Sequence, residues 1–135
     1  MVLVDTSAWI QHFKSQTSHL KYILREETVV THEFILGELS LGQFKQKDRL
    51  QIFERIEALP RLATSNHSDI IRFVQSEKIH GKGIGWIDCH LIHACIKNNI
   101  RLFTLDSHLL KIAKKAKRHN TVRSLHLSQN FTKGI

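Results

Sequence analysis

The sequence lacks any long apolar run, and it is poor in the residues that mark secreted or membrane-bound proteins. Its 135 residues include two cysteines and one proline. No apolar stretch approaches the roughly 18–20 residues that a membrane-spanning helix needs. The first residues, MVLVDT, lack the basic start and the apolar middle of a secretory signal. We therefore expect a cytoplasmic protein with no membrane span.

The two cysteines are too few, and too poorly placed, to form a disulfide framework. Cys89 and Cys95 fall in one expected helix. Six residues of helix separate them by roughly 9 Å along the axis, which exceeds the limit of about 7 Å between the Cα atoms of a disulfide. We expect two buried free thiols, as is usual in a reducing compartment.

Acidic residues are scarce, and this scarcity makes their positions informative. Lysine and arginine number 20 against 12 aspartates and glutamates, a formal charge of +8, and the hydrophobic fraction of 41% is sufficient for a packed core. Four acids stand beside apolar runs: Asp5 in VLVDTSAWI, Glu38 in FILGELSLG, Asp88 in GIGWIDCHLIHACI and Asp106 in RLFTLDSHLL. Without them, the 20 basic residues face 8 acidic ones, a balance of +12. A basic surface is expected of a protein that binds nucleic acid, although a basic soluble protein without such a partner is also compatible with it.

The order of apolar runs and helical patterns predicts an α/β fold with a mostly parallel central sheet. The length fits one domain, residues 1–135, with a core over about 2–118. Strands are expected at 2–4, 28–31 and 101–105, with a last short strand at 121–125 and a polar tail. Helices are expected from Thr6 or Ser7 through Phe13, around Leu20–Leu24, and over 34–44, 48–59, 68–79, 87–98 and 107–118, with Pro60 ending one of them and a flexible glycine-rich loop at 80–86.

Two of the four acids follow expected strands. Asp5 comes directly after the strand at 2–4, and Asp106 directly after the strand at 101–105. Open α/β sheets bind ligands outside the carboxyl ends of their strands, so the two aspartates would be neighbours if their strands are adjacent. Each could instead cap the helix that follows it, although Thr6, Ser7 and Ser107 could also do so.

The other two acids lie on apolar helical faces. Glu38 shares a face with Ile35 and Leu39, and Asp88 shares one with Leu91 and Ile92. A buried carboxylate needs a cationic partner or a metal ion, so a salt bridge is the alternative to a metal site. Four converging carboxylates would repel one another and raise their pKa values. Mg²⁺ or Mn²⁺ would relieve this repulsion, since both ions prefer oxygen ligands. Such a site could hydrolyse a phosphodiester.

The four segments together resemble the PIN-domain family and, within it, the VapC-type ribonuclease toxins. The resemblance covers about residues 2–118 and rests on VDTSAWI, GELSLG, GIGWIDCHLIHA and LFTLDSHL in this order. It implies a three-layer α/β/α sandwich and a Mg²⁺- or Mn²⁺-dependent endoribonuclease. In that family the acids corresponding to Asp5, Glu38, Asp88 and Asp106 bind the metal and activate water. Thr6 and Thr104 fall where hydroxyls support the site, and Ser7 is a weaker candidate.

The resemblance also implies partners. A homodimer is expected, inhibited by a VapB-type antitoxin, with structured RNA such as tRNA or ribosomal RNA as substrate. For RNA binding the candidates are Lys111, Lys114 and Lys115, in a basic stretch that continues through Lys117, Arg118 and His119, and Trp86, which could stack on a base or pack against the helix at 87–98.

Several alternatives stay open from the residues alone. His90 and His93, beside Cys89, could suggest zinc, but no second ligand pair follows at a typical spacing. Glu33 could be a fifth metal contact, or could simply favour the start of its helix. At the level of function, a basic RNA-binding module without catalysis and a metal-dependent DNA nuclease are the competing hypotheses.

Overall fold

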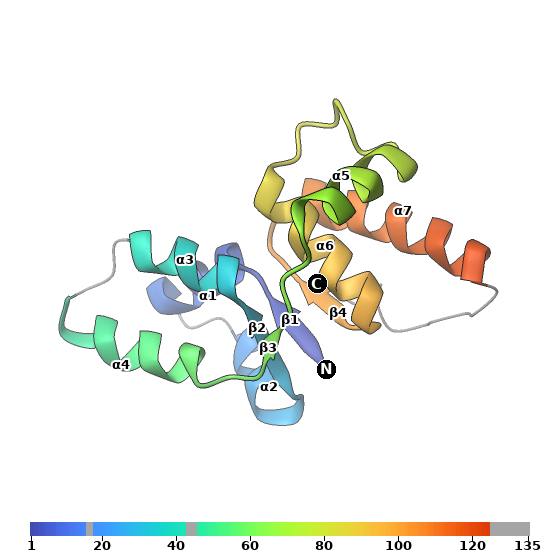
Figure 1. Cartoon of the computed structure of the whole chain (residues 1–135). Coiled ribbons are helices and arrows are strands. Elements are labelled where there is room, and N and C mark those ends of the chain that lie inside the picture. Colours follow the sequence, from blue (N-terminus) through green and yellow to red (C-terminus); the bar gives the residue numbers. More distant parts are fainter. Residues whose placement is uncertain (16–17, 43–45, 125–135) are drawn as a thin grey trace.

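A computed structural model describes the backbone of residues 1–15, 18–42 and 46–124, and the side chains of residues 1–14, 19–42 and 49–118. Helices and strands alternate along this part of the chain (Figure 1). The elements are β1 (Val2–Val4), α1 (Thr6–Ser15), α2 (Ser18–Glu26), β2 (Val29–His32), α3 (Glu33–Leu41), α4 (Gln46–Glu57), β3 (Arg61–Leu62), α5 (His67–Ser76), α6 (Trp86–Asn98), β4 (Arg101–Phe103) and α7 (Ser107–Ser124).

Parallel strands form the central sheet in the order β3-β2-β1-β4. Leu3, in the middle of β1, is in register with Val30 of β2 on one side and Leu102 of β4 on the other. All residues of β1 are inaccessible to solvent. Such complete burial is typical of parallel strands whose two faces are both covered by helices.

The helices lie on both sides of this sheet. Figure 1 shows α1, α3 and α4 on one side and α5, α6 and α7 on the other. α3 contacts β2, and α6 contacts β4. Side chains from both sides and from the sheet form one hydrophobic core. The predicted α/β/α sandwich with a parallel sheet is therefore confirmed.

Some element boundaries differ from the sequence-based prediction. β3 was not predicted, because two residues are too few to give a hydrophobic pattern. The predicted strand at 121–125 is wrong for residues 121–124, which continue α7, and residue 125 lies outside the described residues. Residues 43 and 44, the predicted end of the helix at 34–44, also lie outside them. Among the helices of the described residues, none combines the length and the hydropathy that a membrane span requires.

Candidate active site

Two of the four acids are neighbours because their strands are adjacent. β1 and β4 pair in parallel, and the backbone N–H of Asp5 donates to the carbonyl of Phe103 over 3.1 Å. Asp5 follows β1 directly, and Asp106 ends the short connection from β4 to α7, two residues beyond Thr104. The expectation that both aspartates lie at the carboxyl edge of the sheet is thus met.

Asp5 is buried and held by three donors. Its Oδ1 accepts from the Ser7 hydroxyl at 2.7 Å and from the Ala8 backbone N–H at 3.1 Å, and its Oδ2 accepts from the Thr104 hydroxyl at 2.6 Å. Asp5 therefore does cap α1, but only with one oxygen. Burial raises the pKa of Asp5 above its usual value, these hydrogen bonds oppose the rise, and the charge of Asp106 adds to it.

Asp106 is exposed and caps α7. Its Oδ1 accepts from the backbone N–H groups of His108 and Leu109, at 3.0 and 3.1 Å. Its own N–H donates to the Thr104 hydroxyl at 3.0 Å. One threonine hydroxyl therefore links the two aspartates. The capping alternative is correct for Asp106 too, and it leaves Oδ2 as the oxygen for a further ligand.

Glu38 and Asp88 approach Asp5 and Asp106 from two helices, α3 and α6. Glu38 on α3 is half-buried beside the buried Ile35 and Leu39, and its Oε1 accepts from the Thr6 hydroxyl at 2.8 Å. The ion pairs that the structure gives among its described residues do not include Glu38 or Asp88. The salt-bridge alternative thus finds no support in that part of the chain.

Asp88 lies in the first turn of α6, where a backbone hydrogen bond from Gly85 favours its ionised form. Burial, followed by the negative charges of Glu38, Asp5 and Asp106, raises the pKa of Asp88 to about 6. The four carboxylates therefore act on one another electrostatically and form one acidic site.

The donor set of this site consists of oxygens only, which suits Mg²⁺ or Mn²⁺ better than zinc. As the side chains stand, however, no three His, Cys, Asp or Glu within the described residues are grouped so that they could hold a metal ion. Four carboxylates at one site repel one another, and this repulsion favours a wider spacing. The chemistry of the site fits a divalent cation, and its spacing requires side-chain movement to bind one.

Ser7 proves more closely involved than its sequence context suggested. Besides binding Asp5, its hydroxyl accepts from the Leu105 N–H at 3.3 Å and lies 3.4 Å from the Thr104 hydroxyl. The family resemblance ranks Ser7 below Thr6 and Thr104, and local spacing does not show which segment the Ser7 hydroxyl faces. Only the adjacency of β1 and β4 shows that Ser7, and not Thr6, faces Thr104.

The proposed RNA-binding residues do not lie in one place. Lys111 and Lys115 of α7 line a pocket beside the loop at 77–85, whereas Lys114 is half-buried and does not line it. Lys117, in the same basic stretch, is buried, with 6% of its surface exposed. Trp86 is 39% exposed and begins α6, where its ring stacks on His67 with 5.4 Å between centroids.

The histidines of α6 serve the packing of the fold. His90 is buried against the rings of Phe34 and Trp86, with centroids 4.7 and 5.1 Å away. His93 Nδ1 lies 3.1 Å from the Ser65 hydroxyl. Both cysteines are free and buried, as predicted. No zinc site thus forms among the described residues.

Glu33, the candidate for a fifth metal contact, begins α3, where its charge favours the helix start. Its carboxylate is exposed and accepts from the Thr64 hydroxyl at 2.6 Å.

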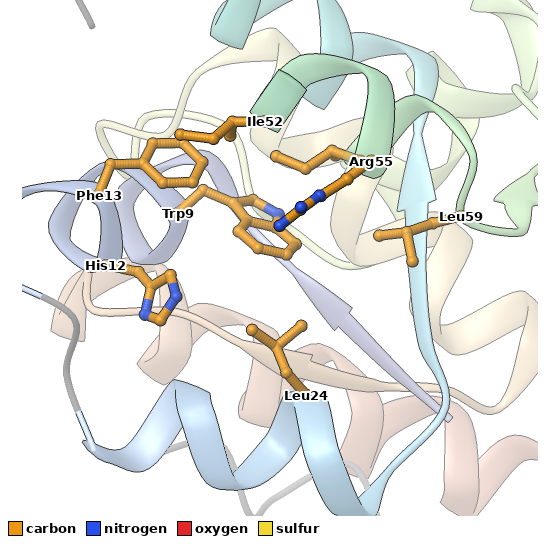
Figure 2. Close-up of a pocket in the computed structure, with 8 residues that line it drawn as sticks. Trp9, His12, Phe13, Leu24, Ile52, Arg55 and Leu59 are labelled. Atoms are coloured by element: carbon orange, nitrogen blue, oxygen red, sulfur yellow. The ribbon is translucent and has the colours of Figure 1, made fainter. Parts of the chain in front are cut away.

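A separate apolar pocket of about 350 Å³ lies between α1, α2 and α4 (Figure 2). Its lining residues are Trp9, His12, Phe13, Leu24, Ile52, Arg55, Ile56 and Leu59. In Figure 2, Arg55 points toward the ring of Trp9. The buried Trp9 Nε1 and His12 Nδ1 have no hydrogen-bond partner among the described residues. The pocket thus combines an apolar lining with two residues whose buried ring nitrogens lack a partner; of these, Trp9 Nε1 is a donor.

Comparison with known proteins agrees with this architecture. The family model of the PIN domain matches residues 2–115. Ribonuclease VapC32 from two strains of Mycobacterium tuberculosis is 30% identical over 110 residues, which cover 81% of this chain and 87% of that protein. The crystal structure of PAE2754 from Pyrobaculum aerophilum has the same fold, with a TM-score of 0.60 and 18% identity over 90% of this chain and 93% of that one. The chain therefore belongs to the PIN-domain family and, within that family, resembles the VapC-type ribonucleases.

Proposed function

We propose that this protein is a Mg²⁺- or Mn²⁺-dependent endoribonuclease and the toxin of a VapBC-type toxin–antitoxin pair. The observation that carries the proposal is the convergence of four carboxylates on one site: the Thr104 hydroxyl links Asp5 to Asp106, and the charges of Glu38, Asp5 and Asp106 all act on Asp88. Charge repulsion of this kind costs folding free energy and is typical of sites tuned for catalysis. The similarity to Ribonuclease VapC32 supports RNA as the substrate.

The four carboxylates are the residues that would hold the cation: Asp5, Glu38, Asp88 and Asp106. A bound divalent cation would lower the pKa of a water and stabilise negative charge on the phosphate. Thr104 and Ser7 orient Asp5, and Thr6 orients Glu38, through the hydroxyl contacts described above. We assign these hydroxyls to positioning the carboxylates.

The direct test is RNA cleavage by the purified chain in Mg²⁺ or Mn²⁺, with tRNA and ribosomal RNA as substrates. Asp88→Asn and Asp5→Asn should each lower the cleavage rate about 100-fold or more, since each removes a charge worth several kcal/mol in such a site. Asp69→Asn is the matched control, because Asp69 is paired with Arg72 on α5, outside the acidic site.

The competing functions give different results in the same assay. A non-catalytic RNA-binding module would retain RNA but cut none of it with either metal. A DNA nuclease would cut a DNA strand of the same sequence faster than the RNA. Normal cleavage by both Asp5→Asn and Asp88→Asn would show that the four acids are not the active site.

We further propose that the apolar pocket between α1, α2 and α4 receives a side chain of the antitoxin. Its apolar lining and the unsatisfied Trp9 Nε1 favour a partner that inserts an apolar group with a nearby acceptor. Leu24→Asp, at a 38% exposed position, should weaken inhibition by a cognate VapB-type antitoxin and leave RNA cleavage intact. Unchanged inhibition would place the antitoxin elsewhere. Homodimer formation, checked by analytical ultracentrifugation, and a cytoplasmic location complete the proposal.

A further inference from the structure

A second pocket, of about 290 Å³, lies between the loop at 77–85 and α7, and we name it the α7–loop pocket. Its cationic lining residues are Lys78 and Lys82 from the loop side and Lys111, Lys115 and Arg118 from α7. Glu77 is the acidic residue among those that line it. All five cationic residues are exposed.

This concentration of positive charge is not neutralised by the ion pairs that the structure gives. Those pairs, Arg25–Glu26, Arg72–Asp69 and Arg101–Glu27, all lie elsewhere among the described residues. Like charges gathered around one hollow repel one another, so their free energy falls when an anion enters. The α7–loop pocket therefore has the electrostatics of an anion-binding site.

The loop side of the pocket is fixed to α7. The His108 ring nitrogen Nε2 lies 2.6 Å from the carbonyl oxygen of Lys82, which joins the loop to the first turn of α7. The Ile79 N–H donates to the Val74 carbonyl at 3.0 Å, and Ile79 is buried. Ile79, Ile112 and Ala116 form the apolar part of the lining. A loop already fixed to α7 lowers the entropy cost of holding a ligand.

The α7–loop pocket is linked to the acidic site through His108. His108, which lines the pocket, donates its backbone N–H to Oδ1 of Asp106. Lys111, Lys115 and Arg118 then follow at helical spacings of four and three residues, so they mark one face of α7 leading away from Asp106. At 1.5 Å per residue this row of cations is about 10 Å long.

We propose that the α7–loop pocket binds the phosphodiester backbone of the RNA substrate, immediately beside the bond that the acidic site cuts. The inference rests on the proposed function and adds to it the path that the RNA strand follows over the protein. A row of cations that starts at a nuclease site suits a continuous polyanion better than an isolated acidic side chain of a protein partner. In this arrangement Lys78 and Lys82 contact the RNA strand from the loop side, and Lys111 and Lys115 contact it from α7.

The test measures binding separately from cleavage. Anisotropy of a fluorescently labelled single-stranded RNA is recorded in EDTA over a range of salt concentrations. Lys111→Gln with Lys115→Gln should weaken binding on the order of 10-fold at low salt, and should reduce the salt slope by about 1.4, or 0.7 for each lost phosphate contact. The control, Lys14→Gln with Lys97→Gln, has the same net charge and changes exposed lysines on α1 and α6. It should retain the wild-type slope.

The possible results distinguish the proposed RNA-binding pocket from the proposed nuclease function. The inference is overturned if the pocket variant binds RNA with the same affinity and salt slope as the control, or if wild-type protein binds no RNA. It is also overturned if the pocket variant keeps its RNA affinity and loses only its affinity for the antitoxin. If the pocket variant alone loses RNA affinity while wild-type protein cuts nothing with metal, the binding site stands and the proposed nuclease function fails. Restored binding by Lys111→Arg with Lys115→Arg would support phosphate contact, because arginine keeps the charge.

Discussion

The ionised Asp88 carboxylate lowers the stability of the fold at neutral and alkaline pH. Its pKa rises from 3.8 to about 6, so the protonated carboxyl is favoured in the folded chain. The contribution of the protonated Asp88 carboxyl to the free energy of unfolding is fully present below pH 3.8 and is lost as pH rises through about 6. We expect metal-free Asp88→Asn to melt at a higher temperature than wild type at pH 8, with the gain disappearing toward pH 4.

Thermal melting in EDTA over this pH range is the measurement, and Asp69→Asn is its control. Asp69 is paired with Arg72, so its loss should lower the melting temperature slightly or leave it unchanged. A stabilisation by Asp88→Asn that is equal at pH 4 and pH 8 would contradict the electrostatic explanation.

Thr104 provides a second test at residue scale. It is 1% exposed, and its hydroxyl donates to Asp5 and accepts from the Asp106 N–H. Thr104→Val keeps the shape but leaves the buried Oδ2 of Asp5 without this donor, so it should cost about 1–3 kcal/mol of unfolding free energy in urea. Thr104→Ser keeps the hydroxyl and should lose less. Equal losses would mean that the hydroxyl does not stabilise Asp5.

The convergence of the four acids could be predicted from sequence, because each stands where an ionised side chain is costly or well placed for a ligand; their role as metal ligands stays a prediction. Glu38 and Asp88 interrupt apolar helical faces, and Asp5 and Asp106 follow strands. The role of Ser7 and the basic pocket around Lys82 could not be predicted. Both depend on which segments become neighbours in space, and local spacing carries no signal for that.

Among the elements, sequence predicted best those with a strong hydrophobic pattern. β1 is short but wholly apolar, β4 has two buried apolar residues after Arg101, and α6 buries a continuous face. The failure at residues 121–124 has a physical reason. Thr121 and Val122 favour strands, but each costs only about 0.7 kcal/mol or less in a helix, and extending an existing helix avoids the cost of a new nucleus.

Replacing glycine by alanine should change the stability of the fold in opposite directions at Gly37, inside a helix, and at Gly81, in a loop. Gly37 lies inside α3 with no atom within 4 Å of an added Cβ, so Gly37→Ala should stabilise the fold by about 0.5–1 kcal/mol. Gly81 has equal space but a φ of +70°. Gly81→Ala should therefore cost about 1–2 kcal/mol from backbone strain alone. Urea unfolding of both variants measures the difference, and a shared sign would refute this reading.

In the molecule as a whole, the acidic and the basic side chains gather in different places. A chain of net charge +8 has four carboxylates at one edge of its sheet and a row of cations along α7. The positive field would attract RNA, while the acids would attract the metal needed to cut it. The order of the four motifs indicated this division, but the position of the cationic pocket next to Asp106 required the fold.

This division predicts that a divalent cation stabilises the entire fold. A ligand that binds only the folded state adds about 2.7 kcal/mol at 100 times its dissociation constant. Mg²⁺ or Mn²⁺ should therefore raise the melting temperature of wild-type protein at pH 8. The rise should shrink as pH falls below about 6, because protons compete at Asp88. Asp88→Asn should lose most of the response, and Asp69→Asn should keep it. An equal response in both variants would place the cation outside the acidic site.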